Sequence, residues 1–215
     1  MIQRRTTDLV IFDCDGVLVD SEPISNAVMA EHITRLGWPM KGAESVRRFK
    51  GRTMAQVHAV IECRLGRAVD PAWRAAFHRE QEDRMRTELR PVPGIKALIG
   101  RVHAAGLDSC VASQGRHEKM AISLGATGLL EVFAGRIFSA VDVARPKPHP
   151  DLFLHAARQM QADPSHCVVI EDSPTGIEGA LAAGMHVIGY DPDRTGLLDA
   201  DGVTVVKAMD GIRIS

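Results

Sequence analysis

The feature that most constrains the fold is a short apolar run that ends in two carboxylates. Residues Leu9 to Phe12 are all hydrophobic, and Asp13, Asp15 and Gly16 follow at once. A continuous apolar run that contains Val and Ile predicts a strand buried on both faces, as in a parallel sheet. Because ligands bind beyond the carboxyl ends of such strands, the two aspartates stand where a functional site is expected.

Two carboxylates this close repel each other unless they share a cation or a proton. A spacing of two residues puts the side chains of Asp13 and Asp15 on one side of an extended backbone, and Gly16 then allows a sharp change of direction. A hard cation such as Mg2+ would satisfy both carboxylates through oxygen ligands. The alternative is a solvated Asp-Gly turn after an ordinary strand, and these residues alone do not decide between the two.

The composition excludes several classes of partner. The chain has 215 residues, enough for one large domain or for a core with a small second module. Its hydrophobic content of 45% and charged content of 25% are typical of a globular protein. A formal net charge of -1 and an aromatic content of 4% argue against nucleic acid and membrane surfaces as partners.

Cysteine usage and hydropathy predict a cytoplasmic protein. The four cysteines form no Cys-x-x-Cys pair, and Cys110 and Cys167 lie in apolar, strand-like runs, so they are expected to be reduced core residues. The polar N-terminal segment 1–8 does not resemble a signal peptide. No apolar run approaches the ~20 residues that a membrane helix needs. A monomer is the default expectation.

After residue 94 the chain alternates between strand and helix patterns, which predicts an α/β fold. We expect a parallel sheet with helices on both faces. The expected strands are 107–112, 136–139, 167–170, 186–190 and 203–206, and the expected helices are 94–105, 117–124, 151–160 and 174–183.

Between the first strand and this alternating region lies a wholly helical insert. A helix is expected from 22 to about 36, and the stretch from about 42 to 88 is rich in Ala, Arg, Glu, Gln and Met. The turn-rich segment 89–94 is expected to link the helical insert to the alternating region that follows. We therefore expect a core made of 1–20 and 90–215, and a small all-helical module made of 21–89.

Three later segments of the expected core also carry polar residues at strand ends or beside prolines. The first is Ser113-Gln114-Gly115, the second is Lys147 between Pro146 and Pro148, and the third is Glu171-Asp172. Because the carboxyl ends of parallel strands emerge on one face, side chains far apart in the sequence can converge there. The converging set is Asp13, Asp15, Ser113, Lys147, Glu171 and Asp172.

Each member of this set suits phosphoryl transfer. A carboxylate nucleophile such as Asp13 is repelled by a phosphate dianion, and Mg2+ between them cancels much of that repulsion. The Glu171-Asp172 pair supplies further oxygen ligands, and Lys147 offers positive charge to the phosphate. Ser113 can donate a hydrogen bond, together with the N–H groups where the next helix begins. Asp15, once protonated, can give its proton to the leaving oxygen.

Taken one at a time, these residues have simpler explanations. Ser113 could cap a helix, Lys147 could be a surface charge, and Glu171-Asp172 could cap the helix expected at Pro174. No single residue is therefore a specific signal, but the four segments together, in this order, are.

That combination closely resembles the haloacid dehalogenase-like hydrolase superfamily, over nearly the whole chain. The resemblance rests on the stretch from Asp13 to Glu22, with Ser113, the Lys147-Pro148-His149-Pro150-Asp151 run and Glu171-Asp172-Ser173. The helical insert is similar to the small cap of the β-phosphoglucomutase-like branch. The resemblance implies a Rossmann-like parallel-sheet core with helices on both faces and an all-helical cap inserted after the first strand.

The same resemblance implies an aspartyl-phosphate mechanism. Asp13 would be the nucleophile and Asp15 the general acid and base. Mg2+ would be bound by Asp13, the backbone carbonyl of Asp15 and Asp172, with Glu171 close by. Ser113 and Lys147 would hold the phosphate. Haloacid dehalogenases proper lack the second aspartate, so Asp15 argues against dehalogenation.

The departures from the family pattern bear on the substrate. Where β-phosphoglucomutases carry a His and a cap Arg, this chain has Ser25 and Met54. Hydrolysis is then easier to explain than mutase chemistry, which must keep water off the aspartyl phosphate. The resemblance is greater to phosphatases of the 6-phosphogluconate or 2-deoxyglucose 6-phosphate type. A β-phosphoglucomutase-like isomerase and a non-catalytic sugar-phosphate-binding regulator are the alternatives.

The expected ligand is thus a small phosphorylated metabolite. Lys50, Arg52 and Arg116 are candidates for contacts with its distal groups. Gln114, which follows the serine of the second motif where Asn or Ser is commoner, is a further substrate-binding candidate.

Overall fold

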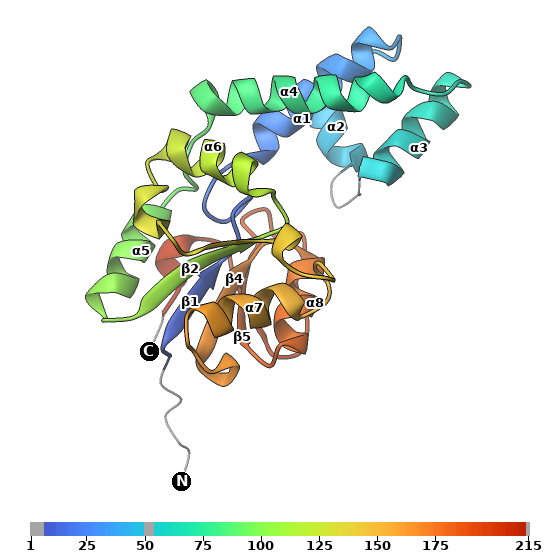
Figure 1. Ribbon diagram of the computed structural model, residues 1–215. Coiled ribbons are helices and arrows are strands. Elements are labelled where there is room, and N and C mark those ends of the chain that lie inside the picture. Colours follow the sequence, from blue (N-terminus) through green and yellow to red (C-terminus); the bar gives the residue numbers. More distant parts are fainter. Residues whose placement is uncertain (1–6, 50–53, 214–215) are drawn as a thin grey trace. The chain divides into compact units, whose positions relative to one another are not determined.

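In the computed structural model the chain forms two compact units, shown in Figure 1. The structure describes residues 7–49 and 54–213. The core unit comprises Met1–Asp20 and Arg90–Ser215, and the helical unit comprises Ser21–Leu89.

The core unit is built on a parallel sheet. Among the described residues the sheet has six strands in the order β3-β2-β1-β4-β5-β6. Every neighbouring pair is parallel, which confirms the α/β prediction. The strands are β1 (Leu9–Phe12), β2 (Asp108–Ser113), β3 (Ile137–Ser139), β4 (Cys167–Glu171), β5 (His186–Tyr190) and β6 (Val203–Val206).

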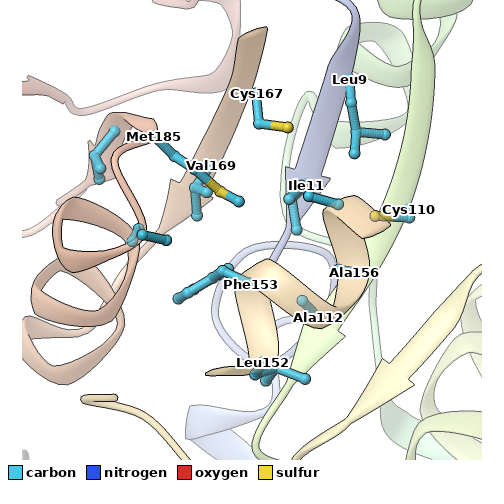
Figure 2. Packing of buried hydrophobic residues seen from close by; sticks show 14 of the residues in the cluster. Leu9, Ile11, Cys110, Ala112, Leu152, Phe153, Ala156, Cys167, Val169 and Met185 are labelled. Carbon is cyan, nitrogen blue, oxygen red and sulfur yellow. The ribbon is translucent and has the colours of Figure 1, made fainter. Parts of the chain in front are cut away.

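The first strand lies in the middle of this sheet and is buried on both faces. All of its residues have an exposed fraction of 0%. Leu9 and Ile11 belong to a cluster that α7 (Asp151–Gln159) and α8 (Pro174–Ala182) complete, and Figure 2 shows Ile11 and Phe153 of α7 among its members. The Phe12 ring contacts the Phe133 ring, with 5.9 Å between centroids. The prediction of a doubly buried strand is therefore confirmed.

The remaining helices of the core unit are α5 (Ile95–Ala104) and α6 (His117–Thr127), with short 3-10 turns at Glu131–Phe133, Ala140–Asp142, Pro164–His166 and Met209–Gly211. The expected helix starting at 117 runs three residues further than predicted. It ends where Gly128 adopts a left-handed φ of 69°, which an L side chain resists. The 3-10 turns were not predicted, because three residues show no periodicity.

The helical unit contains, in its described part, four helices: α1 (Glu22–Arg35), α2 (Gly42–Phe49), α3 (Met54–Leu65) and α4 (Pro71–Glu88). The start of α4 follows its sequence signal, because the Asp70 carboxylate accepts the backbone N–H of Ala72 and Pro71 occupies the first turn. Trp73 and Phe77 of α4 stack against each other, and the His32 ring of α1 meets both edge-on. An aromatic cluster thus joins α1 to α4.

The four cysteines are all free thiols. Cys110 and Cys167 are buried in the core as expected, Cys14 is also buried, and Cys63 is exposed. Across residues 7–49 and 54–213, no helix combines the length and apolar character that crossing a membrane requires.

A charged cluster beside these rings also joins α1 to α4. Glu80 accepts hydrogen bonds from both terminal nitrogens of Arg35, at 2.8 and 3.1 Å, and lies 2.9 Å from the His32 ring. The hydrogen bonds from Arg35, and then that with His32, lower the pKa of Glu80 from 4.5 to about 2. The ionised form of Glu80 is thus held in place by its neighbours.

We expect the Glu80→Gln variant to be less stable than the wild type by about 1 kcal/mol at neutral pH, since the Glu80 side chain is 32% exposed and water screens the pair. A carboxyl whose pKa is lowered by folding stabilises the protein above its ordinary pKa of 4.5 and loses that contribution as the pH falls toward about 2. The difference between the two proteins should therefore shrink on acidification from about pH 5 to about pH 3 in urea unfolding.

The matched control is Glu88→Gln on the same helix, where the carboxylate pairs with Arg84 at an exposed site. It should change stability little. A pH-independent loss in Glu80→Gln would contradict the assignment of the charge as the stabilising element.

Candidate active site

The candidate site is built at the carboxyl ends of three neighbouring strands. Asp13 directly follows β1, Ser113 is the last residue of β2, and Glu171 is the last residue of β4. Because β1 pairs with both β2 and β4 in parallel, these ends share one edge of the sheet. The loop before α7 brings Lys147 to the same edge.

Lys147 connects these strand ends. Its side chain is 1% exposed, and its ammonium donates to Asp13 Oδ1 at 2.6 Å, to Glu171 Oε1 at 2.6 Å and to the Ala112 carbonyl at 3.0 Å. A lysine ammonium has three protons, so each of them has an acceptor. The Phe153 ring, 4.9 Å away, covers the same charge. Lys147 therefore joins the ends of β1, β2 and β4.

The second carboxylate bound to Lys147, Glu171, has protein partners on both oxygens. Its Oε2 accepts the backbone N–H groups of Asp172 and Ser173 and the Ser173 hydroxyl, each at 2.9 Å. The Ser173 hydroxyl in turn accepts the N–H of Gly176 and caps α8. The sequence suggested Glu171 as a metal ligand. In the structure it orients Lys147 and the β4–α8 turn.

The charge balance around Asp13 shifts its acidity. Burial raises the pKa of Asp13 from 3.8 to about 7, with Glu171 and Asp15 adding to the shift and Lys147 opposing it. Burial alone would lower the pKa of Lys147, but the carboxylates of Asp13 and Glu171 hold it above its ordinary value. One buried ammonium thus faces two buried carboxylates.

The second aspartate of the motif binds a different lysine. After Asp13 the chain turns, so that the Cys14 carbonyl accepts the N–H groups of Leu18 and Val19. Within this turn Asp15 forms an isolated β-bridge with Val19. Its Oδ2 lies 2.6 Å from the ammonium of Lys119.

Sequence reasoning missed Lys119. One signal was present, since Lys119 lies in the first turn of α6, whereas cations favour the last turn of a helix. A lysine in the first turn is unfavourable unless a carboxylate offsets its charge, so its presence there suggests such a partner.

Two of the candidate substrate-binding residues, Ser113 and Gln114, lie at the carboxyl end of β2. Ser113 is buried, and its hydroxyl accepts the N–H of Gly115 at 3.2 Å. Helix α6 begins later, after Arg116, so Ser113 is not its cap. Gln114 donates its side-chain amide to the Lys147 carbonyl at 3.2 Å, and Arg116 is exposed. The remaining candidates, Lys50 and Arg52, lie outside the described residues.

The residues around Gly16 fit a small hard cation. A Cβ built on Gly16 would lie 1.9 Å from Oδ2 of Asp172, so the Asp172 carboxylate sits against the backbone that follows Asp15. Lys147 binds Oδ1 of Asp13 and not Oδ2. Among the described residues no group of three or more His, Cys, Asp or Glu side chains gathers as a metal cage. Two carboxylates, a backbone carbonyl and water suit Mg2+, which keeps several of its waters.

Comparison with known proteins identifies the class to which this fold and site belong. Residues 7–184 match the haloacid dehalogenase-like hydrolases. The chain belongs to this family of hydrolases, which confirms the resemblance stated from the motifs.

Three similar proteins can be named, and two of them have a named activity. A 6-phosphogluconate phosphatase from Escherichia coli K12 is 31% identical over 86% of this chain and 83% of its own length. Hexitol phosphatase A from the same organism is 31% identical over 94% of this chain and 95% of its own. A haloacid dehalogenase-like protein from Agrobacterium tumefaciens, of unknown function, is 34% identical, with a TM-score of 0.83 and 94% of each chain covered. The curated relatives named here are phosphatases.

We expect Gly176→Ala to disrupt the Glu171–Lys147 pair. A Cβ at this position would lie 1.9 Å from the carboxyl carbon and Oε1 of Glu171, so the carboxylate would have to move. Overpacking of this kind costs about 1–3 kcal/mol, measured as a lower midpoint in chemical unfolding.

The matched control is Gly100→Ala within α5, where nothing lies within 4 Å of the added carbon. That change should be neutral or stabilise by up to about 1 kcal/mol, because alanine favours the helix. If both variants behave alike, the close approach at Gly176 is not a constraint.

The free energy of unfolding should also depend on pH through the ionisation of Asp13. Folding raises the pKa of Asp13 from 3.8 to about 7, so in that interval the folded protein keeps a proton that the unfolded chain has lost. Stability contributed by this group is present below the lower value and is lost as the pH rises through the interval. Asp13→Asn removes the titration and leaves Lys147 paired with Glu171 alone.

With a metal chelator present, Asp13→Asn should therefore be more stable than the wild type at about pH 8, by on the order of 1 kcal/mol or more. Its advantage should shrink as the pH falls toward about 4. Urea unfolding of both proteins across this range gives the difference directly. An advantage that grows on acidification would have the wrong sign.

Proposed function

We propose that the chain is a Mg2+-dependent phosphomonoesterase that acts on a small sugar phosphate or phosphorylated sugar acid through an aspartyl-phosphate intermediate. The observation that carries the proposal is the Lys147 ammonium bound to Asp13 and Glu171 at the strand ends, with Asp15 and Asp172 beside them. The names of the curated relatives, 6-phosphogluconate phosphatase and hexitol phosphatase A, support the substrate class.

In the first step an oxygen of Asp13 attacks phosphorus. The bond from phosphorus to the leaving oxygen breaks, and its electron pair stays on that oxygen. Lys147 is placed to offer its charge to the phosphate, and the Ser113 hydroxyl to donate a hydrogen bond. Glu171 does not touch the substrate in this scheme. It positions Lys147.

The proton for the leaving oxygen comes from Asp15, the second aspartate of the motif. In the second step a water molecule gives a proton back to Asp15, and its oxygen attacks phosphorus. The bond to Asp13 breaks, and inorganic phosphate leaves. The carboxylate of Asp13 is thereby restored for the next turnover.

A Mg2+ ion held by Asp13, the Asp15 carbonyl and Asp172 would supply positive charge that offsets the repulsion between the nucleophile and the phosphate. The protein's own contribution is to fix these oxygens in place. The β1 hydrogen bonds to β2 and β4 hold Asp13, and the contact with Gly16 holds Asp172.

The test is release of inorganic phosphate from a panel of phosphorylated sugars, sugar acids and hexitols. Asp13→Asn should abolish release, and Asp15→Asn should lower it by about 10²–10⁴-fold. Chelation of divalent ions should stop the reaction and added Mg2+ restore it. The control Asp201→Asn changes an exposed acid of the core unit and should leave the rate unchanged.

Full activity in Asp13→Asn would exclude this mechanism. Interconversion of a sugar phosphate faster than phosphate release would instead identify a mutase. Binding of a sugar phosphate without turnover, with or without Mg2+, would identify a regulator.

A further inference from the structure

The pairing of Asp15 with Lys119 points to a role for a residue outside the family motifs. Lys119 lies on α6, more than a hundred positions along the chain from Asp15, yet the two side chains are 2.6 Å apart. Among the described residues two lysines bind the motif aspartates, Lys119 on Asp15 and Lys147 on Asp13. The two aspartates are thus anchored from two separate segments.

The two ion pairs differ in exposure. The Lys147 and Asp13 side chains are 1% and 9% exposed, whereas those of Lys119 and Asp15 are 26% and 30% exposed. The inner pair is locked in the core. The outer pair is only partly buried, so that Asp15 keeps some contact with solvent.

The backbone is shaped to let Lys119 reach this position. A Cβ built on Gly115 would lie 3.7 Å from the Cδ of Lys119, so the lysine stem packs along the turn that follows Ser113. Meanwhile Gly16, with φ of 83°, turns the chain directly after Asp15. Asp15 therefore lies in a tight turn, and its carboxylate is directed to α6 by the ammonium.

We propose that Lys119 is a positioning residue that holds the carboxyl group of Asp15 in place to protonate the leaving oxygen. This inference rests on the proposed function. It assigns to Lys119 an effect on proton donation in the first chemical step and not on phosphate binding.

The test compares two leaving groups. An alkyl sugar phosphate needs a proton on its leaving oxygen, whereas p-nitrophenyl phosphate has a leaving group stable without one. The ratio kcat/KM covers only binding and the first irreversible step, the attack by Asp13. Lys119→Met should lower kcat/KM for the sugar phosphate by about 10²-fold and for p-nitrophenyl phosphate by less than about threefold.

Three further measurements separate positioning from a structural role. Lys119→Arg should recover much of the loss, because it keeps a cation at the end of a long stem. In an Asp15→Asn background, Lys119→Met should cause no additional loss, since the two residues act as one unit. Inhibition by inorganic phosphate should be unchanged. If Lys119→Met does not fold, Lys119→Gln carries the same comparison.

The charge control is Lys207→Met, which removes an exposed lysine from the same unit. It should alter neither substrate. Equal losses for both leaving groups, no loss with either, or weaker phosphate inhibition would overturn the role of Lys119. Loss of all turnover in Asp13→Asn together with any of these results would leave the proposed function standing and this inference refuted.

Discussion

The structure of the core unit depends on one buried ammonium between two buried carboxylates. Isolated, each of these charges would be too costly to remove from water. Lys147 makes the arrangement possible because its three protons all find acceptors, on Asp13, Glu171 and the Ala112 carbonyl. Since these acceptors come from three adjacent strands, satisfying the charge also fixes the relative positions of the strand ends. The contacts of Lys147 thus hold the strand ends at the edge of the sheet where the candidate site lies.

Much of the fold was predictable from the sequence, because its signals are local. The apolar run Leu9–Phe12 has the pattern of a doubly buried strand, and β5 and β6 begin and end where their patterns do. Asp70-Pro71 marks the start of α4. Boundaries that depend on turn geometry, such as the end of α6 at Gly128, were placed less well, since the sequence does not show which turn the neighbouring packing allows.

The sequence predicted that several polar residues would gather at one edge of the sheet, but not the contacts that they make there. The topology of a parallel sheet explains why Asp13, Ser113 and Glu171 share an edge. The topology does not show that both oxygens of Glu171 would accept hydrogen bonds from protein donors, or that Asp15 would pair with Lys119. Those outcomes depend on side-chain directions after the strands end, where no periodic pattern applies. The roles of Lys50 and Arg52 remain sequence-based predictions, as they lie outside the described residues.

The place of β1 in the sheet has a consequence for how the protein is made. The strand emerges early in synthesis, but its partners are β2, which begins at Asp108, and β4, which begins at Cys167. Closing such distant contacts carries a large entropic cost and is slow compared with forming local helices. The helical unit lies in the sequence between β1 and these partner strands, so its helices can form before β1 is paired. Part of Leu9–Phe12 therefore stays unpaired in a nascent chain until β4 has been synthesised, and transiently exposed apolar segments of this kind favour aggregation.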